Sequence, residues 1–420
     1  MRFRIVVWAY AVWLFAIFDV FYLVQGNNEN ALQLVVACGM IPAACQLSLL
    51  GLDWRGLIAP MRIWLALLLV ILLSYVSNGM NPQTAPSGSE GLTIPAAWTP
   101  IVYTLNTVFI LGIATFVGAC PDRRLLRSIA GVYCLIGTPF LIYIDLTGKM
   151  EWGRLVADLQ PNVWGLMGLT VCLGAFARKP GPLAAAAFGA GMFTILQASS
   201  RENLVALAAV ILVAVVLYFR EMNRPRLWGV LVGTCVALIA IGLLLDPYVF
   251  NAVGYVKRDV LLINNPYRGL ESGFSGRTGI WSETIDLWLK APLLGIGFRQ
   301  HEQFLAGAPA HNAYLAMLAD TGVFGFLIYV FLLVASLIAS WGIEDQRTRR
   351  FVMTVLVSYV IIGFFERRAI NSGNPYGVFF LMCCSVALVD QSLRRAVRLY
   401  RRRRDNAGRL ATLDPSLRAR

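Results

Sequence analysis

The feature that most constrains this chain is its long series of apolar segments. Of its 420 residues, 58% are hydrophobic and only 14% are charged. A soluble fold cannot cover that much apolar surface, whereas a helix of about 20 apolar residues crosses the core of a bilayer. We therefore predict an all-α, polytopic membrane protein of about twelve transmembrane helices. The predicted spans lie at about 5–24, 31–50, 63–78, 99–119, 128–145, 162–177, 182–198, 203–219, 227–246, 321–342, 351–365 and 376–390.

The basic residues predict how these spans are oriented. An even number of spans puts both termini on one side, and 25 of the 36 Lys and Arg residues then lie on that side. The short loops on the other side hold five, and one long loop holds the remaining six. Because basic residues favour the cytoplasmic side, we expect a bacterial inner-membrane protein with both termini in the cytoplasm. The first apolar run is too long for a cleaved signal peptide and is predicted to be a retained helix.

The net charge of +13 follows largely from this asymmetry and from a basic tail. Such a tail beside a membrane favours anionic lipid headgroups, so we do not expect nucleic acid as a partner. The eight cysteines lie within or at the ends of apolar runs and form no Cys-x-x-Cys pair. They are predicted to be small core residues rather than disulfides or metal ligands.

The long loop is the predicted location of the chemistry. We divide the chain into transmembrane helices 1–9 (residues 1–246), an external periplasmic loop (247–320), helices 10–12 (321–390) and a cytoplasmic tail (391–420). Loops of this length in compact proteins are usually functional or disordered. Aromatic residues along the loop favour ordered packing against the membrane: Tyr255, Phe274, Trp281, Trp288, Phe298, Phe304 and Tyr314.

The first helical pattern in the loop runs to Lys290, before Pro292, with Ser275 or Thr278 as the expected cap. Arg277 lies in or beside its first turn. A helix N-terminus with an arginine suits a phosphate. We predict an amphipathic helix that lies along the membrane surface. The alternative is that it does only this, with its arginine at a lipid headgroup. The apolar face is expected to comprise Ile280, Trp281, Ile285, Trp288 and Leu289.

The second pattern predicts a helix from about Pro309 to Gly322, with His311 at its start. The positive end of the helix dipole disfavours imidazolium, so we expect a neutral ring that can act as a general base. The chain has two histidines, and the other, His301, lies in the same loop. The alternative is a histidine that only caps or packs.

Further arginines are expected on the same side. Arg201 follows a short turn between two predicted spans, and Arg367 and Arg368 lie in the last outer loop. Taken singly, each is an ordinary anchoring charge. Together with Arg277 they could form a cationic site at the level of the outer headgroups, where phosphates of a lipid-linked substrate would bind.

At these residues the chain resembles the O-antigen ligase and polymerase superfamily of bacterial membrane glycosyltransferases. The resemblance covers residues 199–325, while the first 190 residues match only in hydropathy. It is carried by Ser199-Ser200-Arg201-Glu202-Asn203-Leu204, by Ser275-Gly276-Arg277-Thr278-Gly279-Ile280-Trp281 through Ala291-Pro292-Leu293-Leu294-Gly295-Ile296-Gly297, and by His311-Asn312-Ala313-Tyr314-Leu315 with Gly322 and Gly325.

The resemblance implies a glycan donor on undecaprenyl diphosphate and an acceptor hydroxyl on another glycan or on lipid A-core. Membrane lipids and a chain-length regulator are further expected partners. It implies an inverting transfer with no cofactor and no metal. His311 would activate the acceptor, while Arg201 and Arg277 would stabilise the leaving diphosphate. Arg368 is added as a diphosphate ligand, and Glu366 as a supporting residue, from their positions in the last outer loop. The other supporting residues are Asn312, Arg367 and Trp281.

Several functions remain open at this point. The turn from Glu366 to Pro375 is similar to that of exopolysaccharide polymerases, which favours polymerisation of repeats over ligation of finished chains. A transporter would place ionisable residues and broken helices within the membrane, whereas here the charges gather at the outer boundary. A non-catalytic scaffold would not need His311.

Overall fold

The structure is a computed structural model that describes residues 1–16, 29–80, 98–151, 154–156, 160–221, 273–305, 309–367, 370 and 374–392. The predicted span at 227–246, residues 247–272 of the long loop and almost all of the predicted tail lie outside these residues. The described part is helical, apart from one short hairpin. Its helices are α1 (Arg2–Trp13), α3 (Glu29–Leu49), α4 (Trp54–Met80), α5 (Trp98–Gly118), α6 (Leu125–Thr147), α7 (Pro161–Phe176), α8 (Pro182–Gln197), α9 (Arg201–Glu221), α12 (Gly273–Lys290), α13 (His301–Phe304), α14 (Ala313–Ser340) and α15 (Gln346–Gly363).

Five of the described helices are long and apolar enough to cross a membrane: Gly56–Val76, Leu125–Thr147, Arg201–Arg220, Ala313–Ser340 and Pro375–Ser392. Four shorter apolar helices lie at Cys38–Leu49, Thr104–Gly118, Pro161–Phe176 and Pro182–Gln197. These lengths and compositions support a membrane protein. The count of twelve spans stays a prediction. The run at 351–365 lies in α15, which is not among the five, and three arginines occupy the first turns of that helix.

Small residues let the central helices approach one another closely. A Cβ added to Gly191 on α8 would lie 2.4 Å from the carbonyl oxygen of Gly168 on α7. Trp164 on α7 is fully buried beside this contact layer. Without a hydrophobic force between helices in lipid, such close backbone packing is the main source of helix association. It holds α7 against α8, with α6 packed on both.

Helix α14 is interrupted at Gly322, where φ is 63° and ψ is −170°. We expected a loop helix to end there and a separate span to begin. The helical geometry does break at Gly322, as predicted, but the two helical segments continue into each other as one element from Ala313 to Ser340 with a kink between them. The element starts four residues later than the predicted Pro309. Asp320, Thr321 and Gly322 interrupt the apolar sequence at the kink.

The kink releases two pairs of backbone groups, and the segment Pro292–Gly297 takes them up. The N–H groups of Ile296 and Gly297 donate to the carbonyls of Ala319 and Asp320, at 3.0 and 2.9 Å. In return, the N–H groups of Val323 and Phe324 donate to the carbonyls of Pro292 and Leu293, at 2.9 and 3.4 Å. Each group that would have bonded within a straight helix therefore has a partner across the kink. We call this pairing the backbone clamp.

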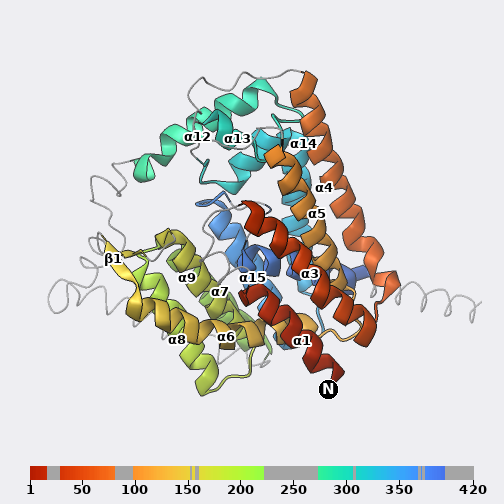
Figure 1. The fold of residues 1–420 in the computed structure, drawn as a ribbon, viewed down its shortest axis with the longest axis vertical. Coiled ribbons are helices and arrows are strands. Elements are labelled where there is room, and N and C mark those ends of the chain that lie inside the picture. Colours follow the sequence, from red (N-terminus) through yellow and green to blue (C-terminus); the bar gives the residue numbers. More distant parts are fainter. Residues whose placement is uncertain are drawn as a thin grey trace, which may run out of the picture.

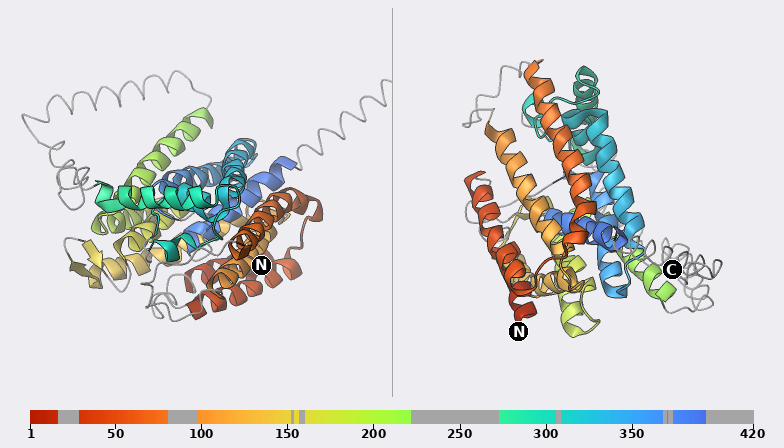
Figure 2. Two further views of the ribbon diagram at one scale, coloured as in Figure 1. Left: turned by 90° about the horizontal axis from the view of Figure 1, so that it is seen from above. Right: turned by 90° about the vertical axis from the view of Figure 1, so that its right-hand side faces the viewer.

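The clamp fixes α12 and α13 at one end of the helices (Figure 1). Figure 2, right, shows the same two helices from the side, with the N-terminus at the opposite end of the molecule. The β1 (Lys149–Glu151) and β2 (Arg154–Val156) strands pair antiparallel, with Glu151 opposite Arg154. The hairpin joins the end of α6 to the start of α7. The elements that carry the predicted site therefore share one end of the helices.

We predict that Gly322→Ala destabilises the protein, because a Cβ there would lie 2.2 Å from the Leu293 carbonyl oxygen and φ is positive. Strain of this kind costs about 1–3 kcal/mol before the overlap is added. Melting of the purified full chain in detergent measures the effect. Gly112→Ala on α5 is the control, since nothing lies within 4 Å of its added Cβ. Equal melting of Gly322→Ala and wild type would contradict the clamp.

Candidate functional site

The start of α14 is built by Asn312 rather than by His311. The Asn312 side-chain oxygen accepts hydrogen bonds from the N–H groups of Tyr314 and Leu315, both at 3.0 Å, which makes it the N-cap. His311 precedes the cap, with φ of 47°. Because Asn312 caps the N-terminus of α14, the helix begins at Ala313 and His311 lies just outside it.

Helix α12 brings Arg277 and Trp281 to the site, one turn apart on the same side of the helix. The helix begins at Gly273, so Ser275 and Thr278 lie within it and the predicted caps are wrong. The helix buries Thr284 and Leu287, whereas Ile285 and Leu289 of the predicted apolar face are 39% and 59% exposed. Exposed apolar side chains agree with a helix whose apolar face is directed at the membrane surface. The helix also packs on α14.

The carboxylate of Glu366, in the turn after α15, lies between two of the predicted catalytic residues. Its Oε1 is 3.9 Å from Nη2 of Arg277, and its Oε2 is 3.8 Å from Nδ1 of His311. The acid is buried, while the side chains of Arg277 and His311 are 18% and 28% exposed. These distances exceed a direct hydrogen bond. Catalytic contacts in unliganded sites are often long and tighten when substrate binds.

Two residues that the sequence did not indicate complete the surroundings of Glu366. The Nδ2 of Asn162, in the first turn of α7, donates to Glu366 Oε1 at 3.0 Å. The Oδ1 of Asn162 accepts from Nη2 of Arg154, on β2, at 2.8 Å. No local pattern predicts contacts between residues this far apart in the sequence. Arg154 is one of the five basic residues in the short outer loops predicted from the sequence.

Arg201 is the first residue of α9 and is half-buried. The turn before it is fixed to α7 and the hairpin. Nδ2 of Asn203 donates to Oγ of Ser200 at 2.6 Å, and Nε of Arg154 donates to the Ala198 carbonyl at 3.0 Å. The structure therefore ties the turn that carries Arg201 to the same arginine that contacts Asn162.

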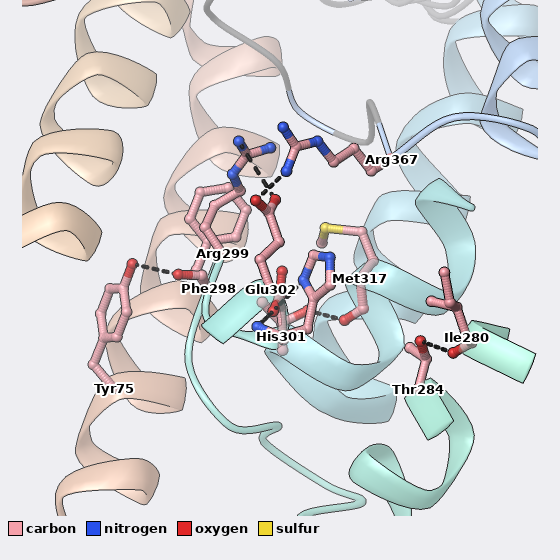
Figure 3. Close-up of polar contacts among 11 residues, drawn as sticks. Tyr75, Ile280, Thr284, Phe298, Arg299, His301, Glu302, Met317 and Arg367 are labelled. Atoms are coloured by element: carbon pink, nitrogen blue, oxygen red, sulfur yellow. Dashed lines mark hydrogen bonds and ion pairs between the residues drawn. The ribbon is translucent and has the colours of Figure 1, made fainter. Parts of the chain in front are cut away.

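A second charged cluster lies beside the first, and Figure 3 shows its members. Arg367 forms an ion pair with Glu302 on α13, and Nη2 of Arg299 lies 3.8 Å from the Oε1 of that carboxylate. Burial alone would raise the pKa of Glu302, but the charges of Arg299 and Arg367 outweigh it, so that the pKa is lowered. The neighbouring residues Glu366 and Arg367 thus serve two different clusters.

His301 has a structural setting. Its Nδ1 lies 2.9 Å from Oδ1 of Asp320, and its backbone N–H donates to the same oxygen at 3.0 Å. Both side chains are almost fully buried. The pair joins α13 to the kinked part of α14, so packing accounts for this histidine. Tyr75 connects α4 to the segment before α13, because its hydroxyl donates to the Phe298 carbonyl at 3.0 Å (Figure 3).

Backbone strain concentrates around these clusters. Within the described ranges, three residues other than glycine have positive φ: Ser199, Arg299 and His311. They lie just before Arg201, beside Glu302 and before the α14 cap. Sparsely populated backbone conformations often mark functional sites, where surrounding contacts maintain them. These three segments carry Arg201, Arg299, Glu302 and His311.

Of the predicted site residues, Arg277, His311 and Glu366 are brought together. Arg201 lies in the turn tied to Arg154, Trp281 is on α12, and Arg367 faces Glu302. Arg368 lies outside the described residues. Among the residues that are described, no group of three or more His, Cys, Asp or Glu side chains is placed to hold a metal ion. The roles of the named residues and the absence of a metal stay predictions.

Comparison with known proteins agrees with the sequence motifs. A family model described as O-antigen ligase matches residues 184–330, from α8 to the middle of α14. Over this segment, about a third of the chain, the protein is similar to the O-antigen ligase family. The match confirms the resemblance to the O-antigen ligase and polymerase superfamily that the motifs at 199–325 suggested. No curated protein matches the chain.

The O-antigen ligase segment contains Arg201, Arg277 and His311, but not Arg154, Asn162 or Glu366. The contacts of Glu366 therefore connect the matched segment to the helices on both sides of it in the sequence. The match indicates a glycosyltransferase-like ligase or polymerase. The apolar helices agree with a membrane location.

We predict that Glu302→Gln lowers stability at pH 7 by about 1–3 kcal/mol, because Arg299 and Arg367 lose their carboxylate. The pKa of Glu302 is lowered from its ordinary value of 4.5 in the folded protein. The contribution of ionised Glu302 to the free energy of unfolding is therefore complete above pH 4.5 and is lost as the pH falls through the pKa of the folded protein. Melting of wild type and variant between pH 7 and pH 3 should show the difference shrinking below about pH 4.5. Glu283→Gln, at an exposed position of α12, is the control. A difference that is constant with pH would contradict this account.

Proposed function

We propose that the protein is a membrane glycosyltransferase that moves a glycan from undecaprenyl diphosphate to an acceptor hydroxyl at the periplasmic face of the bacterial inner membrane. The observation that carries the proposal is the position of Glu366 between Arg277 and His311. One acid beside a histidine and an arginine supports a site with a base at one end and an anion-binding group at the other. The O-antigen ligase match supports the same class of substrate.

In the proposed reaction His311 takes the proton of the acceptor hydroxyl. The freed oxygen attacks the anomeric carbon, the bond from that carbon to the phosphate oxygen breaks, and undecaprenyl diphosphate leaves with the bonding electrons. A single displacement inverts the anomeric centre. Glu366, on the Nδ1 side of His311, would hold that nitrogen as the donor and leave Nε2 to accept the proton.

The leaving diphosphate gains negative charge as the bond breaks, and arginines at fixed positions stabilise it. We assign this role to Arg277 and Arg201, with Arg368 as a further ligand. A donor of this kind typically contributes about 10²–10³ in rate. Without substrate, Arg277 faces Glu366, and a bound diphosphate would attract the arginine more strongly because it carries more charge.

The distribution of basic residues supports a periplasmic site. Arg127 at the start of α6 and Asp345 before α15 form an ion pair at 2.7 Å, and Arg178 and Arg220 lie at the ends of α7 and α9. The three arginines are at the helix ends opposite to those that bear Arg201 and His311. Because basic ends favour the cytoplasm, the candidate site would face the periplasm, with both termini on the inner side.

We further propose that the acceptor is another lipid-linked glycan, so that the protein polymerises repeats and works beside a chain-length regulator. This rests on the similarity of the turn from Glu366 to Pro375 to exopolysaccharide polymerases. Ligation of finished chains to lipid A-core or protein is the second candidate, which the family description favours.

Deletion of the gene distinguishes these two activities. For a polymerase, surface glycans should lose their long chains and retain single repeats. For a ligase, full-length polymer should build up on the lipid carrier. Chromatography of surface and lipid-linked glycans from the deletion strain measures both pools, and complementation with the full chain is the control. Unchanged glycans in both pools would contradict either activity.

We predict that His311→Ala lowers the rate of transfer about 10²–10⁴-fold, and Arg277→Ala about 10²–10³-fold. The assay uses purified protein and lipid-linked glycan extracted from the deletion strain, with no gradient across a membrane. Lys290→Ala, which removes an exposed cation from the same helix as Arg277, is the matched control. Full activity of a folded His311→Ala variant would contradict the assignment of His311 as the base, whereas a lack of transfer by the wild-type protein would contradict the enzyme and favour a scaffold or transporter.

A further inference from the structure

The side chains of Arg154 and Asn162 connect the two halves of the candidate site. We propose that they are positioning residues for the transfer: Arg154 holds the turn before Arg201 with one edge of its guanidinium and, through Asn162, holds Glu366 with another. This inference rests on the proposed function, since Glu366 acts on His311. Neither residue lies in the segment that matches the O-antigen ligase family.

The guanidinium of Arg154 uses two of its nitrogen atoms for two different segments. Nε donates to the carbonyl of Ala198, the C-cap of α8, and Nη2 donates to Oδ1 of Asn162. The planar fork of arginine presents its N–H groups in fixed directions, so the two acceptors are held at a fixed separation. A lysine in this place keeps the charge but lacks the rigid fork.

The amide of Asn162 has a defined orientation because its two neighbours differ in chemistry. Its oxygen accepts from Arg154, which can only donate, and its nitrogen donates to the carboxylate of Glu366. The backbone carbonyl oxygen of Asn162 also accepts a hydrogen bond from Nδ2 of Asn203, in the first turn of α9, at 3.5 Å. Contacts with the hairpin and α9 thus fix the position of Asn162. Asn162 in turn fixes the position of the Glu366 carboxylate.

The consequence concerns how Glu366 divides its two oxygens. Oε1 receives the Asn162 hydrogen bond and also faces Arg277, while Oε2 faces His311. With Oε1 occupied by a neutral donor, the carboxylate stays oriented with Oε2 toward the imidazole. Without that donor, the acid can rotate toward Arg277. His311 then loses the carboxylate that orients it, and Arg277 pairs with Glu366 instead of binding the diphosphate.

The most informative variant is Asn162→Asp, because it keeps the shape and replaces the donor to Glu366 with a second negative charge. We expect kcat to fall about 10–100-fold, the usual effect of removing an outer hydrogen-bond partner at a reactive group. KM for the lipid-linked donor should change little. The added charge favours the protonated form of His311, so the acidic limb of the pH–rate profile should move to higher pH. Arg154→Lys should give a smaller loss of kcat.

Lys149→Gln is the matched control, because it removes an exposed cation from the same hairpin and should leave both constants at wild-type values. If Asn162→Asp is not recovered folded, Asn162→Ala and Arg154→Lys with wild-type melting carry the test. Wild-type kcat and an unchanged pH–rate profile in folded variants would overturn the inference. His311→Ala, assayed beside them, separates the two claims: an inactive His311→Ala with fully active Asn162 and Arg154 variants contradicts only the positioning role, whereas an active His311→Ala contradicts the proposed function itself.

Discussion

The arrangement of the site depends on the exchange of backbone hydrogen bonds at the kink in α14. In a straight helix, N–H groups of the next turn would donate to the backbone carbonyls of Ala319 and Asp320. The segment Pro292–Gly297 could then not form its hydrogen bonds to these carbonyls. Because Gly322 turns the chain out of helical geometry, the two segments complete each other. Gly295 reinforces this, since a Cβ there would lie 2.4 Å from the backbone of Asp320. The clamp orients α12, and therefore Arg277, relative to the start of α14 and His311. It also sets Asp320 where it holds His301.

Around this frame, the arginines of the two described clusters lie beside carboxylates. Arg277 faces Glu366, and both Arg299 and Arg367 face Glu302. Acidic partners lower the cost of burying cations that lie close together before an anionic substrate arrives. In the proposed function the diphosphate competes with Glu366 for Arg277. The acid is then free to serve the histidine, so that substrate binding and activation of the base are coupled through one carboxylate.

Much of the helical framework was predictable, because long apolar runs reveal themselves by composition. The predicted 99–119 and 182–198 agree with Trp98–Gly118 and Pro182–Gln197 to within one residue. Prediction was poorer where a helix extends beyond its apolar run: α4 begins at Trp54 rather than near 63, since its first turns include Arg55, Pro60 and Arg62. The motif order put Arg277 together with His311, and the structure places both beside Glu366. It could not indicate Arg154 or Asn162, whose roles depend on contacts between distant segments, nor that Arg367 turns toward Glu302 while Glu366 turns the other way.

The central claim is that one diphosphate binds between the arginines of α9 and α12, with His311 beside it. A cryo-EM structure of the full chain in lipid nanodiscs with undecaprenyl diphosphate tests this most directly. The account predicts density for the diphosphate in contact with the guanidinium groups of Arg201 and Arg277, at the end of the helices that carries α13, with the His311 ring facing it. Diphosphate density at the opposite end of the helices, or a His311 ring turned away from Arg277, would contradict it.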